Sequence, residues 1–196
     1  MNVRLIAPGL AVMVLVMALG ACGHSPPTRF YLLGVVRAST PVAQYVGPAV
    51  QLRAVHIPSV LDRNELVSAL PGGRVDIDQF RQWGAPMADM IRGVLSRDLS
   101  ERLPAGMVVP DQAPAPPHSR GVVVDILEFQ PEAGGSVVLQ VAWTLLADGP
   151  VHPAQYGQRH LERTGVGASA SDRVQAMSDL LGQLAGALAQ SIRSSS

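Results

Sequence analysis

Cys22 is the residue with the most distinctive chemistry, because it is the only cysteine and it ends an apolar run. The run begins near Leu10 and closes in Leu19-Gly20-Ala21-Cys22. Small side chains before a cysteine are typical of a bacterial lipoprotein signal, in which a narrow peptidase pocket admits small residues. A lone cysteine has no partner for a disulfide. Its thiol can instead carry diacylglycerol and its new amino group an acyl chain, so we expect the mature chain to begin at Cys22.

Two other interpretations of this segment remain open. Ala18 and Gly20 could serve an ordinary secretory signal that makes no use of the cysteine. A membrane-spanning helix is the weaker alternative, because Leu10–Leu19 supplies ten apolar residues where roughly 20 are needed. Gly23, not aspartate, follows the cysteine, which by the sorting rule of enteric bacteria favours the outer membrane. We therefore predict a signal peptide over 1–21 and a lipid anchor on the periplasmic face of the outer membrane.

The mature chain has the size and charge of one ordinary domain. Removing residues 1–21 leaves 175 residues, enough for a single hydrophobic core. The 15 basic and 15 acidic side chains balance, and no basic patch is visible, so nucleic acid is not an expected partner. Residues 22–29 form a short tether, whose polar part spans about 20 Å at most. We expect a domain over 30–196 that lies close to its membrane.

No arrangement typical of an enzyme is found. The histidines are scattered and form no His-x-x-x-His pair on a helix, which argues against a zinc site. They are His24, His56, His118, His152 and His160. His160 and Glu162 are predicted to share one face of a strand, as are Asp76 and Asp78, but solvated strand faces explain both pairs more simply. There is no nucleophile elbow or phosphate-binding loop, so we expect no catalytic activity, metal or cofactor.

Alternation of apolar and polar residues predicts a chain rich in strands. The candidate strands are 30–36, 50–57, 65–70, 75–80, 121–130, 136–147 and 156–164. Turn residues at 131–135 predict a hairpin, and Pro71-Gly72-Gly73 joins the two short candidate strands before it. The last candidate strand is expected to pair antiparallel with the one before it. In 136–147 one face is clearly apolar. It consists of Val137, Leu139, Val141, Trp143 and Leu145.

Two segments have the three- and four-residue spacing of amphipathic helices. The first follows Pro86, whose missing N–H suits a first helical turn. Its apolar stripe is Met87, Ile91, Val94, Leu95, Leu99 and Leu103, and its solvent-facing residues are predicted to be Arg92, Arg97, Asp98 and Glu101. The second has Ser171 as the predicted N-cap. Its stripe is Val174, Met177, Leu181, Leu184, Leu188 and Ile192.

Together these elements predict the fold class. A run of strands with two long helices indicates a single α+β domain. We expect an antiparallel-rich β-sheet with the two amphipathic helices packed on one face.

Five segments, taken in order after the cysteine motif, resemble the ABC-type transport auxiliary lipoproteins of the PqiC type. They are Phe30–Leu33, His56–Arg63, Phe80–Met87, Val94–Leu99 and Asp125–Phe129. Order and spacing carry the resemblance over nearly the whole mature chain, because each segment alone is ordinary core or turn sequence. One difference follows Leu66–Leu70, where the family often has an arginine or aromatic residue and a longer strand.

The resemblance implies a periplasm-facing lipoprotein of the outer membrane that serves a transport system built around an envelope-spanning MCE-domain protein. Such systems are associated with phospholipids or other hydrophobic molecules and with envelope integrity. The expected role is docking of the MCE assembly, with a homo-oligomeric ring as one arrangement. The alternatives are a structural envelope lipoprotein, or a lipid carrier with an apolar pocket of roughly 300 Å³ or more between sheet and helices.

The partner-facing surface is placed at Leu61, Asp62 and Arg63. On this interpretation Leu61 is exposed and Arg63 is available for pairing. On the alternative, Leu61 fills the core and Asp62 caps a turn. Trp83 and Trp143 could be interface anchors, since aromatic residues are enriched at binding hot spots. Both stand in strongly patterned core segments, so we expect them to be buried.

Overall fold

Three consecutive antiparallel strands form the long arm of the sheet in the computed structural model, which describes residues 26–38, 44–147 and 154–195. They are β6 (Arg120–Glu132), β7 (Ser136–Leu145) and β8 (Gln155–Arg163). Gly134 and Gly135 both have positive φ in the turn between β6 and β7, a backbone conformation that glycine adopts without strain. The predicted hairpin and the third antiparallel strand are confirmed.

Parallel strands complete the sheet on the other edge of β6. The strand β2 (Val50–His56) runs parallel to the first half of β6, and the short β5 (Val108–Val109) runs parallel to β2. A hairpin, a helix, the short β5 and a long loop separate β2 from β6 in sequence, and parallel neighbours require a crossover of this kind. The β2 strand ends just before Pro58, as its sequence predicts.

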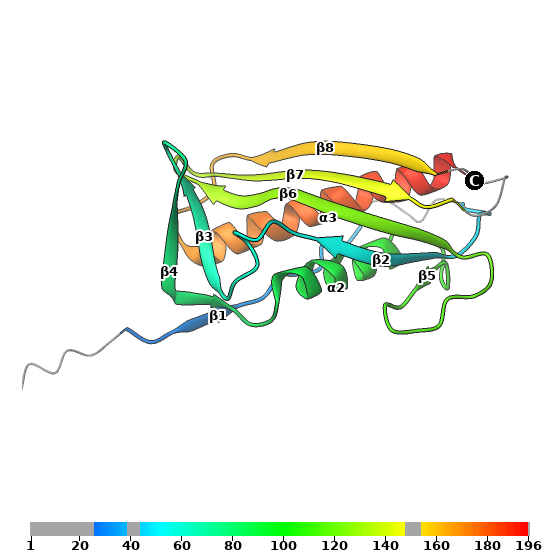
Figure 1. Ribbon diagram of the computed structural model, residues 1–196, viewed down its shortest axis with the longest axis horizontal. Helices are drawn as coiled ribbons and strands as arrows, with labels where there is room; N and C mark the ends of the chain where they lie inside the picture. Colours follow the sequence, from blue (N-terminus) through cyan, green and yellow to red (C-terminus); the bar gives the residue numbers. More distant parts are fainter. Residues whose placement is uncertain (1–25, 39–43, 148–153, 196) are drawn as a thin grey trace, which may run out of the picture.

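A second hairpin stands at one end of the molecule, on the left of Figure 1. It consists of β3 (Glu65–Leu70) and β4 (Arg74–Trp83), both predicted as strands, which pair antiparallel. Beside it, β1 (Arg29–Tyr31) runs parallel to the end of β4. At the other edge of the hairpin, β3 meets the end of β6 where Ala69 pairs with Glu132.

The sheet as a whole is mixed, so the expectation of an antiparallel-rich sheet fitted only in part. Within the described residues it has eight strands, and four of its seven strand pairings are parallel. Alternation reports which face of a strand is buried but not which strand lies beside it. The single α+β domain with two long helices is confirmed.

Two helices cover one face of this sheet and contact each other (Figure 1). The helix α2 (Met87–Ser100) lies against β2, and α3 (Ala170–Ser194) lies against β6, β7 and β8. Pro86 precedes α2 as its N-cap, one position earlier than predicted. Within the described part of the chain, neither helix has the length and hydropathy needed to cross a membrane.

The N-cap of α3 is Ser169, not the predicted Ser171. The Ser169 hydroxyl accepts the backbone N–H of Asp172 at 3.1 Å. Asp172 also stands in the first turn, where the positive end of the helix dipole favours a carboxylate. Serine at either position satisfies the sequence rule, so only the backbone geometry decides between them.

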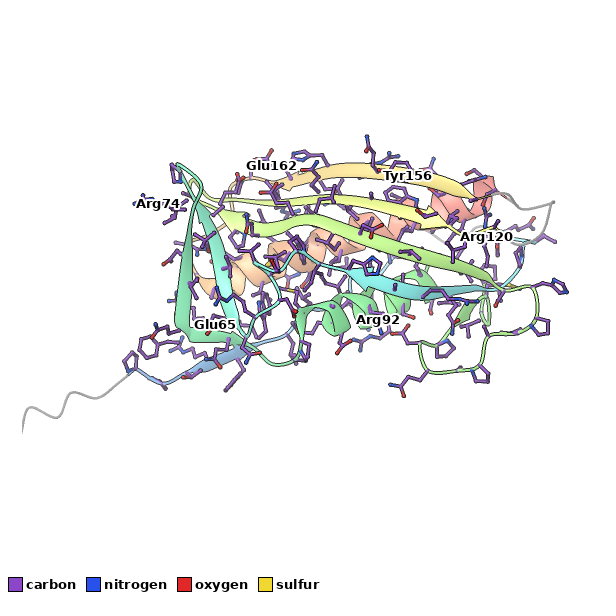
Figure 2. All side chains as sticks on the ribbon, in the orientation of Figure 1. Glu65, Arg74, Arg92, Arg120, Tyr156 and Glu162 are labelled. Atoms are coloured by element: carbon purple, nitrogen blue, oxygen red, sulfur yellow. The ribbon has the colours of Figure 1, made fainter. Side chains whose placement is uncertain are left out.

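The core lies between the sheet and the two helices. All six stripe residues of α3 and the apolar face of β7 are buried, as predicted. Trp83 and Trp143 are also buried, with 6% and 2% of their surfaces exposed. Arg120 is buried too, and its guanidinium donates to the backbone oxygens of Leu146 and Ser195 at 3.2 Å. Figure 2 shows Arg120 at the end of the molecule where β6 begins.

Candidate functional site

The most constrained surface segment follows β1 and consists of residues 32–38, which we call the N-terminal strap. We predicted a strand over 30–36, but β1 ends at Tyr31 and the strap crosses to the helices instead. The Gly34 N–H donates to Ser178 Oγ on α3 at 2.9 Å, and the Val36 N–H donates to Asp98 Oδ1 on α2 at the same distance. The strap therefore takes its hydrogen bonds from helices, not from a neighbouring strand.

Close packing supports the strap as well. At Gly182 on α3, an added Cβ would lie 2.7 Å from Cβ of Val36. Such a distance is too short for two carbon atoms, so the strap can approach α3 this closely only at a glycine. Gly182 thus has a specific role, which is to let the strap pack closely on α3.

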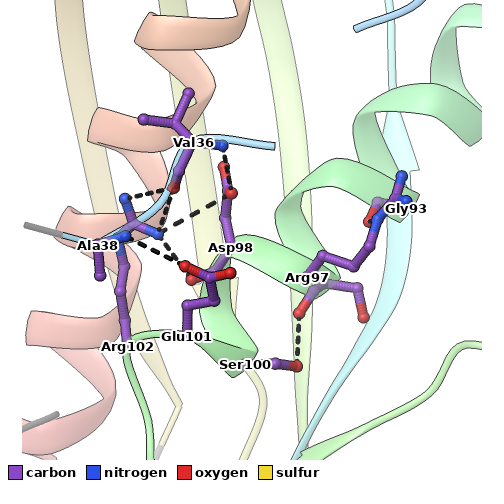
Figure 3. Close-up of polar contacts among 9 residues, drawn as sticks. Val36, Ala38, Gly93, Arg97, Asp98, Ser100, Glu101 and Arg102 are labelled. Atoms are coloured by element: carbon purple, nitrogen blue, oxygen red, sulfur yellow. Dashed lines mark hydrogen bonds and ion pairs between the residues drawn. The ribbon is translucent and has the colours of Figure 1, made fainter. Parts of the chain in front are cut away.

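Charged residues near the end of α2 complete this arrangement (Figure 3). The Arg102 guanidinium donates to the Val36 carbonyl at 3.3 Å, and the Ala38 N–H donates to Glu101 Oε2 at 3.2 Å. Asp98 is fully buried. Burial raises the pKa of Asp98, while the Val36 hydrogen bond and Arg102 oppose that shift. The expectation that Asp98 faces solvent was therefore wrong.

The sequence does contain a signal for the burial of Asp98. It follows Ile91 by seven residues and Val94 by four, and these spacings return to the same face of a helix. Our assignment went by residue type and overlooked position. A carboxylate on an apolar stripe needs partners when it is buried, and the strap N–H supplies one of them.

The predicted partner surface lies in the turn that leads into β3. The Leu61 N–H donates to the Pro58 carbonyl at 2.9 Å, and the Asp62 N–H donates to the Ser59 carbonyl at 3.3 Å. Leu61 belongs to the core, with 4% of its surface exposed, so the interpretation in which it fills the core fits the structure. Asp62 and Arg63 are exposed. Asp62 and Arg63 therefore remain predicted partner-facing residues, whereas Leu61 does not.

Arg63 already has a partner within the chain. Its Nε lies 3.2 Å from Oε2 of Glu65, with both side chains about one third exposed. Exposed pairs of this kind contribute roughly 0–1 kcal/mol to stability. The pair can therefore exchange for an intermolecular one at little cost.

The side chains considered for catalysis stand apart from one another. His160 and Glu162 are exposed on β8, and Asp78 bonds Arg81 at 2.5 Å instead of joining Asp76. His56 pairs with Asp125 at 2.7 Å across β2 and β6, an exposed contact that we did not anticipate. Among the described residues, no group of three or more histidine, cysteine, aspartate or glutamate side chains could hold a metal.

The remaining candidates include two histidines and the cysteine motif. His24 and His152 lie outside the described residues, as do Leu19, Gly20, Ala21 and Cys22. Their roles stay predictions.

The described residues form several hollows at the surface of the fold. A hollow of about 330 Å³ between the end of β8 and the start of α3 is lined by Arg163, Asp172 and Asp179 among other residues. A smaller one, about 240 Å³, lies on the face of the sheet away from the helices. The space between sheet and helices is filled by buried apolar side chains. These observations do not favour a lipid carrier with its own apolar cavity.

The fold is one α+β domain whose N-terminal strap is hydrogen-bonded to both helices. Residues 31–189 match the family described as ABC-type transport auxiliary lipoprotein component. The chain belongs to this family, so the predicted resemblance is confirmed. The family description names an accessory part of a transport system and a lipoprotein, which agrees with the coarse function and the membrane-anchored, periplasmic setting predicted above.

Solved structures share the fold. One, a crystal structure of an uncharacterized protein, has a TM-score of 0.72 at 21% identity and covers 85% of this chain and 99% of its own. Another, from Xanthomonas campestris and assigned to DUF330, has a TM-score of 0.70 at 14% identity, with 86% of this chain and 96% of its own covered. No curated protein sequence matches this chain significantly.

Proposed function

We propose that this chain is an outer-membrane lipoprotein and an accessory component of an MCE-type, ABC-associated transport system for phospholipids or other hydrophobic molecules. Through that role it supports envelope integrity. One observation carries the proposal: the family match begins at residue 31, nine residues after the cysteine of Leu19-Gly20-Ala21-Cys22. This spacing places a lipidation motif directly before a transport-auxiliary domain.

In this proposal the signal peptide over 1–21 is removed, residues 22–29 form the lipidated tether, and residues 30–196 form the auxiliary domain. Several acyl chains on Cys22 would hold it durably, since each buried methylene contributes about 0.8 kcal/mol. The strand β1 supports such an attachment, because its pairing with β4 holds Arg29, the point at which the tether meets the domain.

The proposed role is docking of an MCE-domain protein, with several copies of the chain around its end. The filled core supports docking over lipid carriage. Asp62 and Arg63 form an exposed turn with charges of both signs, and such residues commonly set orientation and encounter rate at interfaces.

The proposal is tested by affinity capture from detergent-solubilised envelopes. We expect the wild-type protein to be captured together with an MCE-domain protein from the outer-membrane fraction. A Cys22→Ala variant is expected to leave that fraction and lose the complex, while a Ser25→Ala variant keeps both. A Cys22→Ala variant that remains in the membrane with its complex intact would contradict the proposed anchor. A captured complex without any MCE-domain protein would contradict the proposed partner.

A second experiment tests the docking turn. The charge reversal Arg63→Glu should reduce the recovered partner about three- to tenfold, corresponding to roughly 1 kcal/mol. Arg74→Glu is the matched control, because Arg74 is an exposed arginine at the far tip of the β3–β4 hairpin (Figure 2). Equal recovery with both variants would remove Arg63 from the partner surface.

A further inference from the structure

Large apolar side chains are exposed where β1 enters the domain. Phe30 has 66% of its surface exposed, Leu32 has 64% and Phe80 has 42%. Phe30 and Leu32 lie two residues apart on an extended chain, so they point to the same side. Phe80 belongs to β4, which pairs with β1 through Arg29 and Arg81. We call these three side chains the tether-side patch.

The tether-side patch borders the chain that leads back to Cys22. A surface hollow of about 330 Å³ lies between this chain and β4. Its lining consists of Pro26, Pro27, Arg29, Asp78, Phe80 and Arg81. Phe80 therefore faces the same hollow as the first described residues of the tether. The exposed Arg29 and the half-exposed Arg81, which pairs with Asp78, place positive charge beside the apolar surface.

The length of chain between the cysteine and the patch limits what can cover it. Four residues lead from Cys22 to Pro26, and four residues span at most about 14 Å. An acylated Cys22 lies at the membrane surface, so Pro26 is held within that distance of it, and Phe80 lines the same hollow as Pro26. Exposed aromatic side chains flanked by arginine are the composition that membrane–water interfaces favour.

We propose that the tether-side patch inserts into the headgroup region of the bilayer as a second membrane contact beside the lipid anchor. The domain then stands on the membrane with its β1–β4 end, and the opposite end, where Tyr156 is labelled in Figure 2, points away from it. This inference rests on the proposed lipidation of Cys22 and adds an orientation that a tether alone does not impose. Its partner is the lipid surface itself.

Brominated lipids test the proposal, because they quench a tryptophan that enters the bilayer. The full-length lipoprotein, purified with its native anchor, is reconstituted on vesicles of phosphatidylethanolamine and phosphatidylglycerol with brominated chains. In a Phe80→Trp variant one of three tryptophans would reach the layer roughly 5–10 Å deep, so emission should fall by about a third. Tyr156→Trp, at a more exposed position on β8 (68% exposed against 42% for Phe80), should lose almost none.

A second substitution separates the patch from the anchor. Phe30→Glu in the Phe80→Trp background should abolish the quenching while the protein still floats with the vesicles. Val46→Glu is the matched control, since Val46 is an exposed apolar residue before β2, and it should leave the quenching intact.

The contrary outcomes are distinct. A protein that floats but shows no quenching, or shows it equally at positions 80 and 156, overturns the membrane contact and leaves the proposed transport role standing. Quenching that disappears while copies cross-link through position 80 assigns the patch to a second copy and likewise overturns it. A protein that fails to float overturns the membrane contact together with the anchor.

Discussion

Asp98 Oδ1 accepts the backbone N–H of Val36 at 2.9 Å, across 62 positions of sequence. This bond joins the N-terminal strap to a fully buried carboxylate on α2. Since the strap continues directly from β1, the bond holds the segment after β1 against α2. Arg102 closes the arrangement by donating to the carbonyl of Val36.

Removing the Asp98 carboxylate should destabilise the domain. An Asp98→Ala variant leaves the Val36 N–H without its acceptor, and an unsatisfied buried donor costs about 1–3 kcal/mol. Asp98→Asn retains an acceptor oxygen and should cost less. Urea unfolding followed by circular dichroism measures both. Asp76→Ala, at an exposed position of β4, should unfold like the wild type; a similar midpoint for Asp98→Ala would contradict the role of the bond.

The raised pKa of Asp98 predicts a pH dependence. Burial shifts the pKa above its ordinary value of 3.8, so the folded protein holds the proton to higher pH than the unfolded chain. Stability from this group is therefore fully present below the unfolded pKa and declines as pH rises toward the folded pKa. The free energy of unfolding of the wild type, relative to Asp98→Asn, should fall over that window. Asp111, whose pKa burial also raises, is common to both proteins, so its effect cancels. A difference that rises with pH would contradict the assignment.

Two glycine substitutions should have opposite effects. At Gly157 an added Cβ would overlap the Trp143 ring, its partner across β7 and β8, so Gly157→Ala should destabilise by about 1–3 kcal/mol. At Gly186 on α3 nothing lies within 4 Å of an added Cβ. Gly186→Ala should therefore stabilise by about 0.5–1 kcal/mol through helix propensity. Thermal unfolding reads both signs, and tryptophan fluorescence should change only for Gly157→Ala.

The cap of α3 gives a local prediction. Ser169→Ala removes the acceptor of the Asp172 N–H and should cost about 1 kcal/mol. Ser171→Ala changes a residue inside the first turn and should be close to neutral. Equal losses in chemical denaturation would show that the hydroxyl of Ser169 is not the decisive cap.

Local sequence patterns predicted most of the elements. Alternation predicted β2 and β7, turn residues predicted the β6–β7 hairpin, and helical spacing predicted α2 and α3 with their buried stripes. These patterns succeed because residues on one face of a strand or helix recur every two, or every three to four, positions in the sequence. The burial of Trp83 and Trp143 followed from the same patterns.

Contacts between distant segments were beyond such patterns. The parallel pairing of β2 with β6 depends on how α2 returns the chain to the sheet. The strap does not continue the predicted strand, because its Gly34 and Val36 N–H groups donate to Ser178 and Asp98 on the helices. The burial of Leu61 likewise depends on the tertiary structure, in which the turn around it places this side chain in the core.

The sequence alone determined that this chain has a single cysteine after small residues, two amphipathic helices and several strands, because composition and short-range spacing are written directly in it. Only the tertiary structure decided that Asp98 is buried, that the sheet is mixed, and that Phe30 and Phe80 come together beside the tether. Those properties depend on contacts between segments that lie far apart in the sequence. Such contacts form only in the complete fold, and they determine which side chains are shielded from water.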